Sequence, residues 1–475
     1  MNIQTQLSKI PLYIACSLLA TVPLLFGAVH PIVSAGYVFL VLVGLGSWLC
    51  FCVPEQEPSL IAMPWLLPLL LLLVYTVVQS IPLPLSWIEF LSPARALRVE
   101  MVNALAGTQQ NFVSLSDHGL FSLTRVALLA ALLIYFLGLK ALMRNDDKIG
   151  RILFLIIIAV GVFEALYGLF QFLSPQVGIL WLPLKARAAS GTIIYKNQYA
   201  SLLNMCWPLA LAGAAICLTG TPKHPRKKSR HQTLRARIRR MDDTTKRAPL
   251  FFLATGIMLL AVLFSLSRGG IISMFLVMLL LNFFLPLSRK LRFIFLGLLG
   301  VFLYGYGSLL GLDTLISRFN NIGASGSSRW EIYQASLSML MDHWVSGVGL
   351  GSYSLLSPVY LKGIALGGHV DKAHNEYLQL AIEIGVLPVF FFFTWLACAM
   401  MMACKRLVTN IKKSGEQNDP LLIIGSGAFC GLIGFFIHGF VDFGWRLPAN
   451  LFYAVTLAAL LSHSIATFRM KQNKG

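Results

Sequence analysis

The most regular feature of the sequence is a series of apolar blocks separated by short polar segments. Each block runs for about 18 to 22 residues with almost no charge, the length that a helix needs to cross roughly 30 Å of hydrocarbon. The apolar run Leu66–Tyr75 has no polar residue at alternate positions, which excludes the strands of a membrane barrel. The pattern therefore predicts an all-α, polytopic integral membrane protein.

About twelve transmembrane helices follow from these blocks. The first block could be read as a signal peptide, but it lacks a small-residue cleavage site and another block follows at once, so we interpret it as a span. An even number of spans puts both termini on one side of the membrane. The predicted spans are residues 11–29, 32–52, 60–79, 120–142, 151–173, 198–219, 249–267, 270–287, 293–311, 375–403, 421–440 and 448–467.

The distribution of Lys and Arg sets the orientation of these spans. In this topology 26 of the 38 Lys and Arg residues lie on the side of the termini, and 11 of them are in the segment 223–247. Excess positive charge marks the cytoplasmic side, so both termini are expected in the cytoplasm. Two long segments, about 80–119 and 312–374, then lie outside.

This topology divides the chain into four regions. Residues 1–119 hold the N-terminal spans and the first outer loop, and residues 120–311 hold the central spans with a basic cytoplasmic loop at 220–248. Residues 312–374 form a large outer loop, and residues 375–475 hold the C-terminal spans.

Composition and charge exclude several classes of function. The chain is 57% hydrophobic and 12% charged, against roughly 25% charged in soluble domains. Its net charge of +19 would suit a nucleic acid, but the segment 223–247 has no aromatic residue for base stacking, so we expect contact with membrane lipids and no nucleic acid. The eight cysteines lack the spacing of a zinc site, and no nucleotide-binding glycine loop is present. Neither a metal nor a cofactor is expected.

Several arginines break the positive-inside rule, because the topology puts them outside. Arg268 sits between two apolar blocks with almost no loop, and Arg187, Arg329 and Arg446 lie near other span ends. The planar guanidinium of Arg suits bidentate contact with phosphate oxygens. An alternative for Arg268 is a side chain that extends to lipid phosphates beside a glycine turn.

Two polar residues stand near these arginines in the predicted topology. Glu164 lies inside the fifth span, and an intramembrane carboxylate indicates a functional site by default, with Arg187 or Arg268 as its expected partner. A purely structural ion pair is the alternative. Asn197 marks the start of the sixth span, where its side chain can cap the helix.

His374 is the leading candidate for proton transfer. It precedes Asn375 at the entry to a span, and the unperturbed pKa of histidine, about 6.5, suits a general base near neutrality. An interfacial histidine without chemistry is the alternative. A further polar cluster at the outer end of the eleventh span can be a packing network or part of the same pocket: His438, Asp442 and Arg446.

Taken as a set, these motifs resemble the O-antigen ligase and polymerase superfamily. The resemblance runs from about Phe121 to Leu461. It is carried by Arg187 with Gly191, Asn197 and Ala200, by Ser267-Arg-Gly-Gly270, by Arg329 with Gly347-Val-Gly-Leu-Gly351, and by His374-Asn-Glu-Tyr-Leu-Gln-Leu-Ala-Ile-Glu-Ile-Gly385.

The resemblance implies a bacterial inner-membrane glycosyltransferase of GT-C-like architecture, with helices in its large periplasmic loop and an active site that faces the periplasm. The donor would be a glycan linked to undecaprenyl pyrophosphate, and the acceptor a sugar hydroxyl of lipid A core or of a growing lipid-linked polysaccharide, with inversion and without a metal. His374 would be the catalytic base, and Arg187 and Arg268 would hold the pyrophosphate. The expected substrate-binding residues are Arg329, Asn197, Glu164, Asn375 and Arg446.

Other functions remain open at this point. A protein O-oligosaccharyltransferase would use the same donor with a protein acceptor. A lipid or polysaccharide transporter would show discontinuous helices or repeats near the midplane, which the sequence does not reveal. Cell-wall polymerases would carry a periplasmic catalytic acid, and a scaffold would leave the outward arginines unexplained.

Overall fold

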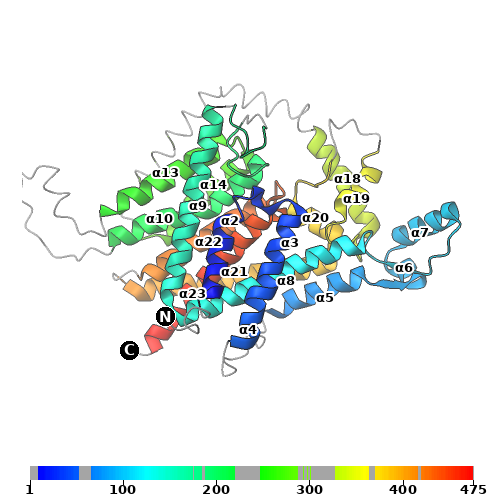
Figure 1. Cartoon of the computed structure of the whole chain (residues 1–475), viewed down its shortest axis with the longest axis horizontal. Coiled ribbons are helices and arrows are strands. Elements are labelled where there is room, and N and C mark those ends of the chain that lie inside the picture. Colours follow the sequence, from blue (N-terminus) through cyan, green and yellow to red (C-terminus); the bar gives the residue numbers. More distant parts are fainter. Residues whose placement is uncertain are drawn as a thin grey trace, which may run out of the picture.

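The structure, a computed structural model, is an assembly of helices (Figure 1). It describes residues 9–52, 66–174, 176–183, 188–219, 246–286, 327–362, 370–415 and 419–473, together with isolated positions between 292 and 300. Strands in this part of the chain are limited to one antiparallel pair in which Pro82 lies opposite Ser114. The prediction of an all-α polytopic membrane protein is confirmed.

The N-terminal region contributes helices at the edge of the bundle. After α2, a continuous helical segment is formed by α3, the π-helical turn η2 and α4. The elements are α2 (Ile10–Thr21), η1 (Phe26–Ala28), α3 (Pro31–Phe39), η2 (Leu40–Leu45), α4 (Gly46–Cys52) and α5 (Leu67–Ser80).

The centre of the chain supplies the longest helices, several of which start at a capping side chain. Asp146 caps α9 by accepting a hydrogen bond from the N–H of Lys148, and Ser267 caps α14 by accepting from Gly270. The elements are α8 (Gly119–Asn145), α9 (Asp147–Leu173), α10 (Lys196–Thr219), α13 (Ala248–Phe264) and α14 (Arg268–Phe284).

The C-terminal region consists of three long helices, with a short helical turn between the last two. Asp419 caps α22 by accepting from the N–H of Leu421, with Pro420 at the first helical position. The elements are α21 (Val386–Ser414), α22 (Pro420–His438), η6 (Gly444–Arg446) and α23 (Pro448–Asn473).

Shorter elements form a layer at one end of the bundle, opposite the start of α2 and the end of α23 (Figure 1). Both long segments predicted to lie outside the membrane contribute helices to this layer. Its elements are β1 (Pro82–Pro84), α6 (Leu85–Leu91), α7 (Pro93–Ala106), β2 (Phe112–Ser114), α18 (Ser327–His343), α19 (Tyr353–Tyr360) and α20 (Glu376–Ile384).

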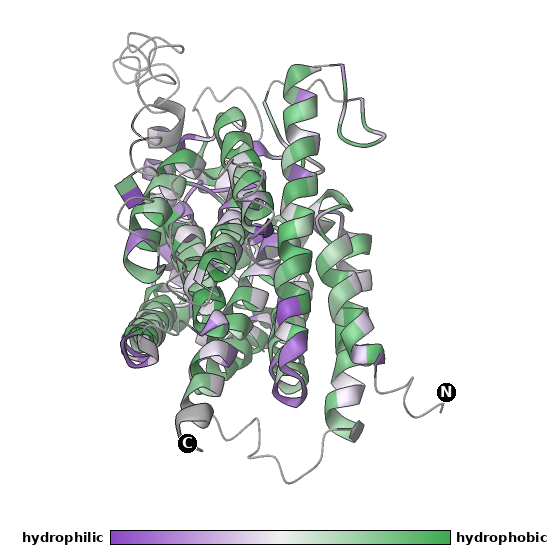
Figure 2. Ribbon diagram, turned by 90° about the vertical axis from the view of Figure 1, so that its left-hand side faces the viewer, coloured by the Kyte–Doolittle hydropathy of each residue, from purple (hydrophilic) through white to green (hydrophobic). Residues whose placement is uncertain are grey.

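Eleven of the predicted spans coincide at least in part with a described helix, and the described helices carry the expected hydropathy. Seven are long and apolar enough to cross a membrane, and α2, α5, α13 and α14 are shorter apolar helices. Figure 2 shows that the helices are hydrophobic along most of their length. The predicted span 293–311 lies outside the described residues apart from single positions, so the count of twelve stays a prediction.

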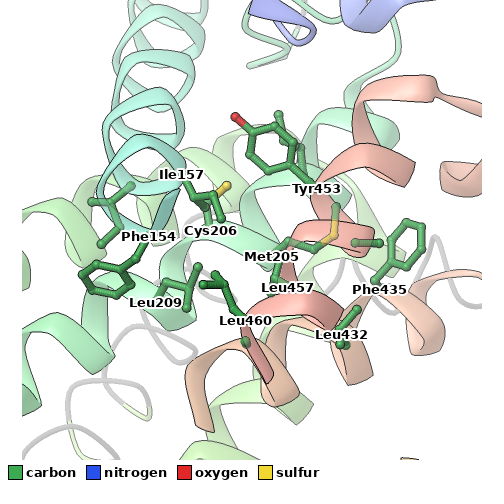
Figure 3. Packing of buried hydrophobic residues seen from close by; sticks show 14 of the residues in the cluster. Phe154, Ile157, Met205, Cys206, Leu209, Leu432, Phe435, Tyr453, Leu457 and Leu460 are labelled. Atoms are coloured by element: carbon green, nitrogen blue, oxygen red, sulfur yellow. The ribbon is translucent and has the colours of Figure 1, made fainter. Parts of the chain in front are cut away.

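The hydrophobic core is built around α10. The span window of α10 is 83% buried, whereas that of α21 is only 6% buried, so α10 is the central helix and α21 lies at the periphery. Figure 3 shows the packing of α10 against α9, α22 and α23. The core side chains labelled there are Phe154, Ile157, Met205, Cys206, Leu209, Leu432, Phe435, Tyr453, Leu457 and Leu460.

The predicted span 375–403 is wrong as a single helix. The chain forms α20, breaks at Gly385 with φ of 86°, and then begins α21. A Cβ on Gly385 would collide with the carbonyl group of Val345, so a close tertiary contact imposes the break. Nine residues of helix extend only about 14 Å, too short to cross a bilayer, so α20 belongs to the outer layer.

The loop that contains the glycines at 347, 349 and 351 is bonded to the end of α20, and both are bonded to α5. All three have positive φ, and the N–H groups of Val348 and Gly349 donate to the carbonyls of Ile382 and Glu383 at 2.9 Å. The side chain of Gln79, at the end of α5, donates to the carbonyls of Ser346 and Glu383. The end of a membrane helix and the end of α20 are thereby held together.

A buried histidine ties α18 to α7. His343 accepts a hydrogen bond from Arg98 at 3.1 Å, and its other ring nitrogen lies 3.3 Å from the hydroxyl of Ser92. Burial, together with the positive charge of Arg98, lowers the pKa of His343 to about 4.

This depressed pKa predicts an acid-sensitive outer layer. The unfolded chain binds a proton at about pH 6.5 and the folded chain only near pH 4, so stability is constant above pH 6.5 and falls by up to roughly 3 kcal/mol between the two values. In His343→Gln we expect a smaller drop in melting temperature between pH 7 and pH 5 than in the wild type. Equal drops in the two proteins would show that His343 is not the responsible group.

Candidate functional site

The predicted site residues that the structure describes gather at the end of the bundle that carries the outer layer. This region combines the segment before α10, the start of α14, the start of α20 and the turn between α22 and α23. Backbone groups make some of the contacts between these segments. The N–H of Glu376 donates to Gly439 at 2.9 Å, and the N–H of Ala189 donates to Phe264 at 2.9 Å.

His374 is held in an unusual backbone conformation immediately before α20. Its φ is +52°, a region that few residues other than glycine adopt. The hydroxyl of Tyr333 in α18 donates to the carbonyl of His374 at 3.1 Å, and the side chain of Asn375 caps α20 by accepting from the N–H of Leu378 at 3.1 Å. The outer layer therefore holds the backbone of His374 in place, and Asn375 fixes the start of α20 at the next position.

One carboxylate lies between two imidazole rings. Oδ1 of Asp442 is 4.0 Å from Nδ1 of His374, and Oδ2 of Asp442 is 3.8 Å from Nε2 of His438. The side chains of Asp442 and His438 are buried, whereas that of His374 is 27% exposed. His374 is therefore the imidazole of this pair that a substrate can reach.

The position of Asp442 favours one tautomer of His374. A carboxylate that faces Nδ1 stabilises a proton on that nitrogen, so that Nε2 is the proton-accepting atom. The edge of the Phe443 ring packs against the imidazole with centroids 5.0 Å apart, which restricts rotation of the ring. At 4.0 Å the carboxylate acts on the imidazole through its charge and not through a direct hydrogen bond.

Arg268 begins α14 next to these histidines. Its side chain is exposed, and the next residue, Gly269, packs so closely on His438 that an added Cβ would lie 3.1 Å from Nε2 of that ring. The positive end of the α14 dipole and the Arg268 guanidinium both favour an anion at this position. Arg268 is therefore placed to meet a negatively charged ligand beside His438 and Asp442.

The segment that contains Arg187 is only partly described, and Arg187 itself lies outside the described residues. Two residues later, Ala189 is bonded to Phe264, which is four residues before Arg268 in the sequence. The chain just after Arg187 thus lies beside the turn that leads to Arg268.

Glu164 holds this segment to α9 through Thr192, whereas one of its two predicted partners, Arg187, lies outside the described residues. Its carboxylate accepts from the N–H of Thr192 at 2.8 Å and from the hydroxyl of Thr192 at 2.6 Å, and the residue is fully buried. Gly191 has φ of 60°, and a Cβ there would collide with the Glu164 carboxylate. The expected contact with Arg268 is therefore replaced by a backbone anchor, which a linear pattern of charges does not reveal.

Asn197 and Arg329 are two further residues that were predicted to belong to the site. Asn197 is half-buried and is the second residue of α10, so it lies inside the first turn and not at the predicted capping position. Arg329 lies in the first turn of α18, but its side chain is outside the described part of the structure.

Comparison with protein families identifies the region that carries these residues. Residues 253–393 match the family described as O-antigen ligase. This match supports the resemblance to the O-antigen ligase and polymerase superfamily. The matched stretch includes four of the predicted site residues, which are Arg268, Arg329, His374 and Asn375. A comparison with curated proteins gives no match.

Arg446 lies outside the matched O-antigen ligase stretch and is bonded to it through two acidic residues. Its guanidinium donates to Glu376 at 2.9 Å and to Glu383 at 2.7 Å, and both carboxylates are buried. Burial alone would lower the pKa of Arg446, but the two carboxylates outweigh this effect and raise it. The backbone N–H of Trp445 also donates to Glu376 at 2.8 Å. This network fixes the turn with Asp442 against α20.

Three residues near the candidate site were not predicted from the sequence as site residues. Glu383 follows Glu376 by seven residues, a spacing that places both on one helix face and could have suggested their shared partner. Arg125 of α8 lies close enough to Glu383 and Arg446 to interact with them electrostatically. Arg125 lies inside a predicted span, so it was not among the cations that were predicted to lie outside the membrane. Nothing in the sequence around Phe443 indicated a site residue, because its contact with His374 depends on the tertiary fold.

Proposed function

We propose that the protein is an inverting membrane glycosyltransferase of the O-antigen ligase or polymerase type, in the inner membrane of a bacterium. The donor is a glycan linked to undecaprenyl pyrophosphate, and the acceptor is a sugar hydroxyl of lipid A core or of a growing lipid-linked polysaccharide, at the periplasmic face. The observation that carries this proposal is the position of His374, which faces Asp442 and lies, like Arg268, within the stretch that matches the O-antigen ligase family.

In the proposed reaction, Nε2 of His374 removes the proton from the acceptor hydroxyl. The acceptor oxygen forms a bond to the anomeric carbon of the donor while the bond from that carbon to the pyrophosphate oxygen breaks. The electron pair of the broken bond stays on the undecaprenyl pyrophosphate. Attack from the side opposite the leaving group inverts the anomeric configuration.

The arginines act on the leaving group in this proposal. Arg268, with Arg187 and Arg329, binds the pyrophosphate and stabilises the negative charge that grows on it, an effect that is commonly the largest part of such catalysis. The remaining predicted residues hold the pocket in place. Glu164 anchors the segment after Arg187, Asn197 lies at the start of α10, Asn375 caps α20, and Arg446 fixes the turn with Asp442.

Arg268→Ala is expected to reduce transfer by about 10²- to 10³-fold without lowering the amount of folded protein, because it removes charge stabilisation from the leaving group. Arg268→Lys should rescue only part of the rate, since an ammonium cannot form the bidentate contact. Transfer is measured with purified protein and a polyprenyl-pyrophosphate-linked glycan.

Lys405→Ala provides the matched control, because Lys405 is an exposed cation near the cytoplasmic end predicted for α21. This variant should transfer at the wild-type rate. Wild-type activity in Arg268→Ala would remove the proposed role of Arg268 in leaving-group stabilisation.

A further inference from the structure

A second polar pocket lies in the outer layer, away from the site around His374. It has a volume of about 350 Å³ and lies between α7, the segment around Asp117 and α19. The helix α18 contacts both places. Its Tyr333 contacts His374, and its His343, ten residues later, is bonded to Arg98 of this pocket. Ten residues of helix separate the two contacts by about 15 Å along the helix axis. The pocket is lined by Arg95, Arg98, Val99, Val102, Gln110, Asp117, Leu355 and Leu356.

The pocket carries an excess of one positive charge. Arg98 donates to both carboxylate oxygens of Asp117 at 3.0 Å, and Nη1 of Arg95 lies 2.8 Å from the same carboxylate. Nε2 of His343 must accept the hydrogen bond from Arg98, since a guanidinium only donates, and that ring is therefore not doubly protonated. Two guanidinium groups thus face a single carboxylate.

Arg95 has hydrogen-bond donors to spare for a ligand. Its Nη1 is used by Asp117 and its Nε points to the carbonyl of Ser114 at a long distance of 3.5 Å. Among the described residues, no hydrogen bond is formed by its Nη2. The side chain is 19% exposed, so this nitrogen can reach a group that enters the pocket.

The other walls of the pocket are apolar and continue into an exposed apolar surface. Val102 and Leu355 are each more than half exposed at the rim, whereas Leu356 is buried. Only Ile81 and the three-residue strand β1 separate the end of the apolar helix α5 from the α6–α7 pair, which keeps this pair at the membrane surface. The exposed apolar residues on α6 and α7 are Trp87, Phe90, Leu97, Met101 and Leu105.

We propose that this pocket binds the phosphate group of an anionic membrane phospholipid. The phosphate contacts Arg95 beside the Arg98–Asp117 pair, and the hydrocarbon part lies along Val102 and Leu355. A ligand with both an anionic head and an apolar tail matches both halves of the pocket, whereas a free phosphate matches only one. This site is separate from the donor site proposed around His374.

The test uses the full chain in a neutral detergent with dihexanoylphosphatidic acid as the probe, followed by titration calorimetry. Arg95→Gln removes the excess charge but leaves Asp117 paired with Arg98, so the fold should persist. We expect it to weaken binding at least about tenfold, as the loss of a hydrogen bond from a charged group does. Lys362→Gln, at an exposed lysine near the end of α19, should bind like the wild type.

Asp117→Asn separates loss of charge from loss of structure. It increases the positive charge of the pocket, so it should bind the probe more tightly, a result that unfolding cannot produce. Unchanged binding in Arg95→Gln, or weaker binding in Asp117→Asn, would overturn the proposal. Inorganic phosphate that binds as tightly as dihexanoylphosphatidic acid would also overturn it, because the apolar half of the pocket would then contribute nothing.

Discussion

Replacing His374 with alanine is expected to slow glycosyl transfer by about 10² to 10⁴, or about 3 to 5 kcal/mol of transition-state stabilisation. The reason is the loss of the one imidazole in the Asp442 cluster that is exposed enough to reach an acceptor. The variant should still bind the lipid-linked donor. Single-turnover transfer and donor binding, measured on the same purified protein, check the two parts separately.

Neighbouring groups define the controls for this experiment. Asp371 is half-exposed and paired with Lys372 at 2.8 Å, so Asp371→Asn should retain full transfer. Glu376 cannot replace His374 as the base, because its buried carboxylate accepts hydrogen bonds from Trp445 and Arg446. If His374→Ala lost donor binding but turned over normally at saturation, His374 would be a binding residue and the proposed mechanism would be wrong.

The second large effect is expected on stability and not on chemistry. Arg446→Met should destabilise the protein by about 3 to 5 kcal/mol, because Glu376 and Glu383 would remain buried without the cation that is bonded to both of them. The midpoint of thermal unfolding in detergent measures this loss. Arg151→Met, at an exposed arginine of α9, should leave the midpoint near that of the wild type.

A triple variant tests the cause of this loss. Arg446→Met combined with Glu376→Gln and Glu383→Gln removes all three charges together, so much of the stability should return. If the single and triple variants were equally unstable, packing of the Arg446 side chain would explain the effect, and the electrostatic account of this network would fail.

Hydropathy predicted the membrane helices because a helix in lipid must satisfy its own backbone hydrogen bonds, which makes length and apolarity sufficient signals. It did not predict the break at Gly385. The residues on both sides of this glycine, Ile384 and Val386, are as apolar as those of a continuous span. The break depends on the close contact with Val345, 40 positions earlier in the sequence, which no local pattern contains.

The candidate site was predictable where a residue type is unusual for its position. Arg268 between two apolar blocks and His374 at a helix entry are examples. The partners of such residues were harder to predict. The bond from Thr192 to Glu164 was not predicted, because it depends on a tight turn at Gly191 that brings the N–H of Thr192 to the carboxylate.

The central claim is that the protein transfers a glycan from undecaprenyl pyrophosphate to an acceptor hydroxyl. The most direct measurement is a reaction of the purified, reconstituted protein with a polyprenyl-pyrophosphate-linked glycan and a lipid A core acceptor or a second lipid-linked glycan. We predict that free polyprenyl pyrophosphate and elongated acceptor appear together in equal amounts, and that both are lost in His374→Ala. A donor that stays intact, or that only moves across the membrane, would contradict the account.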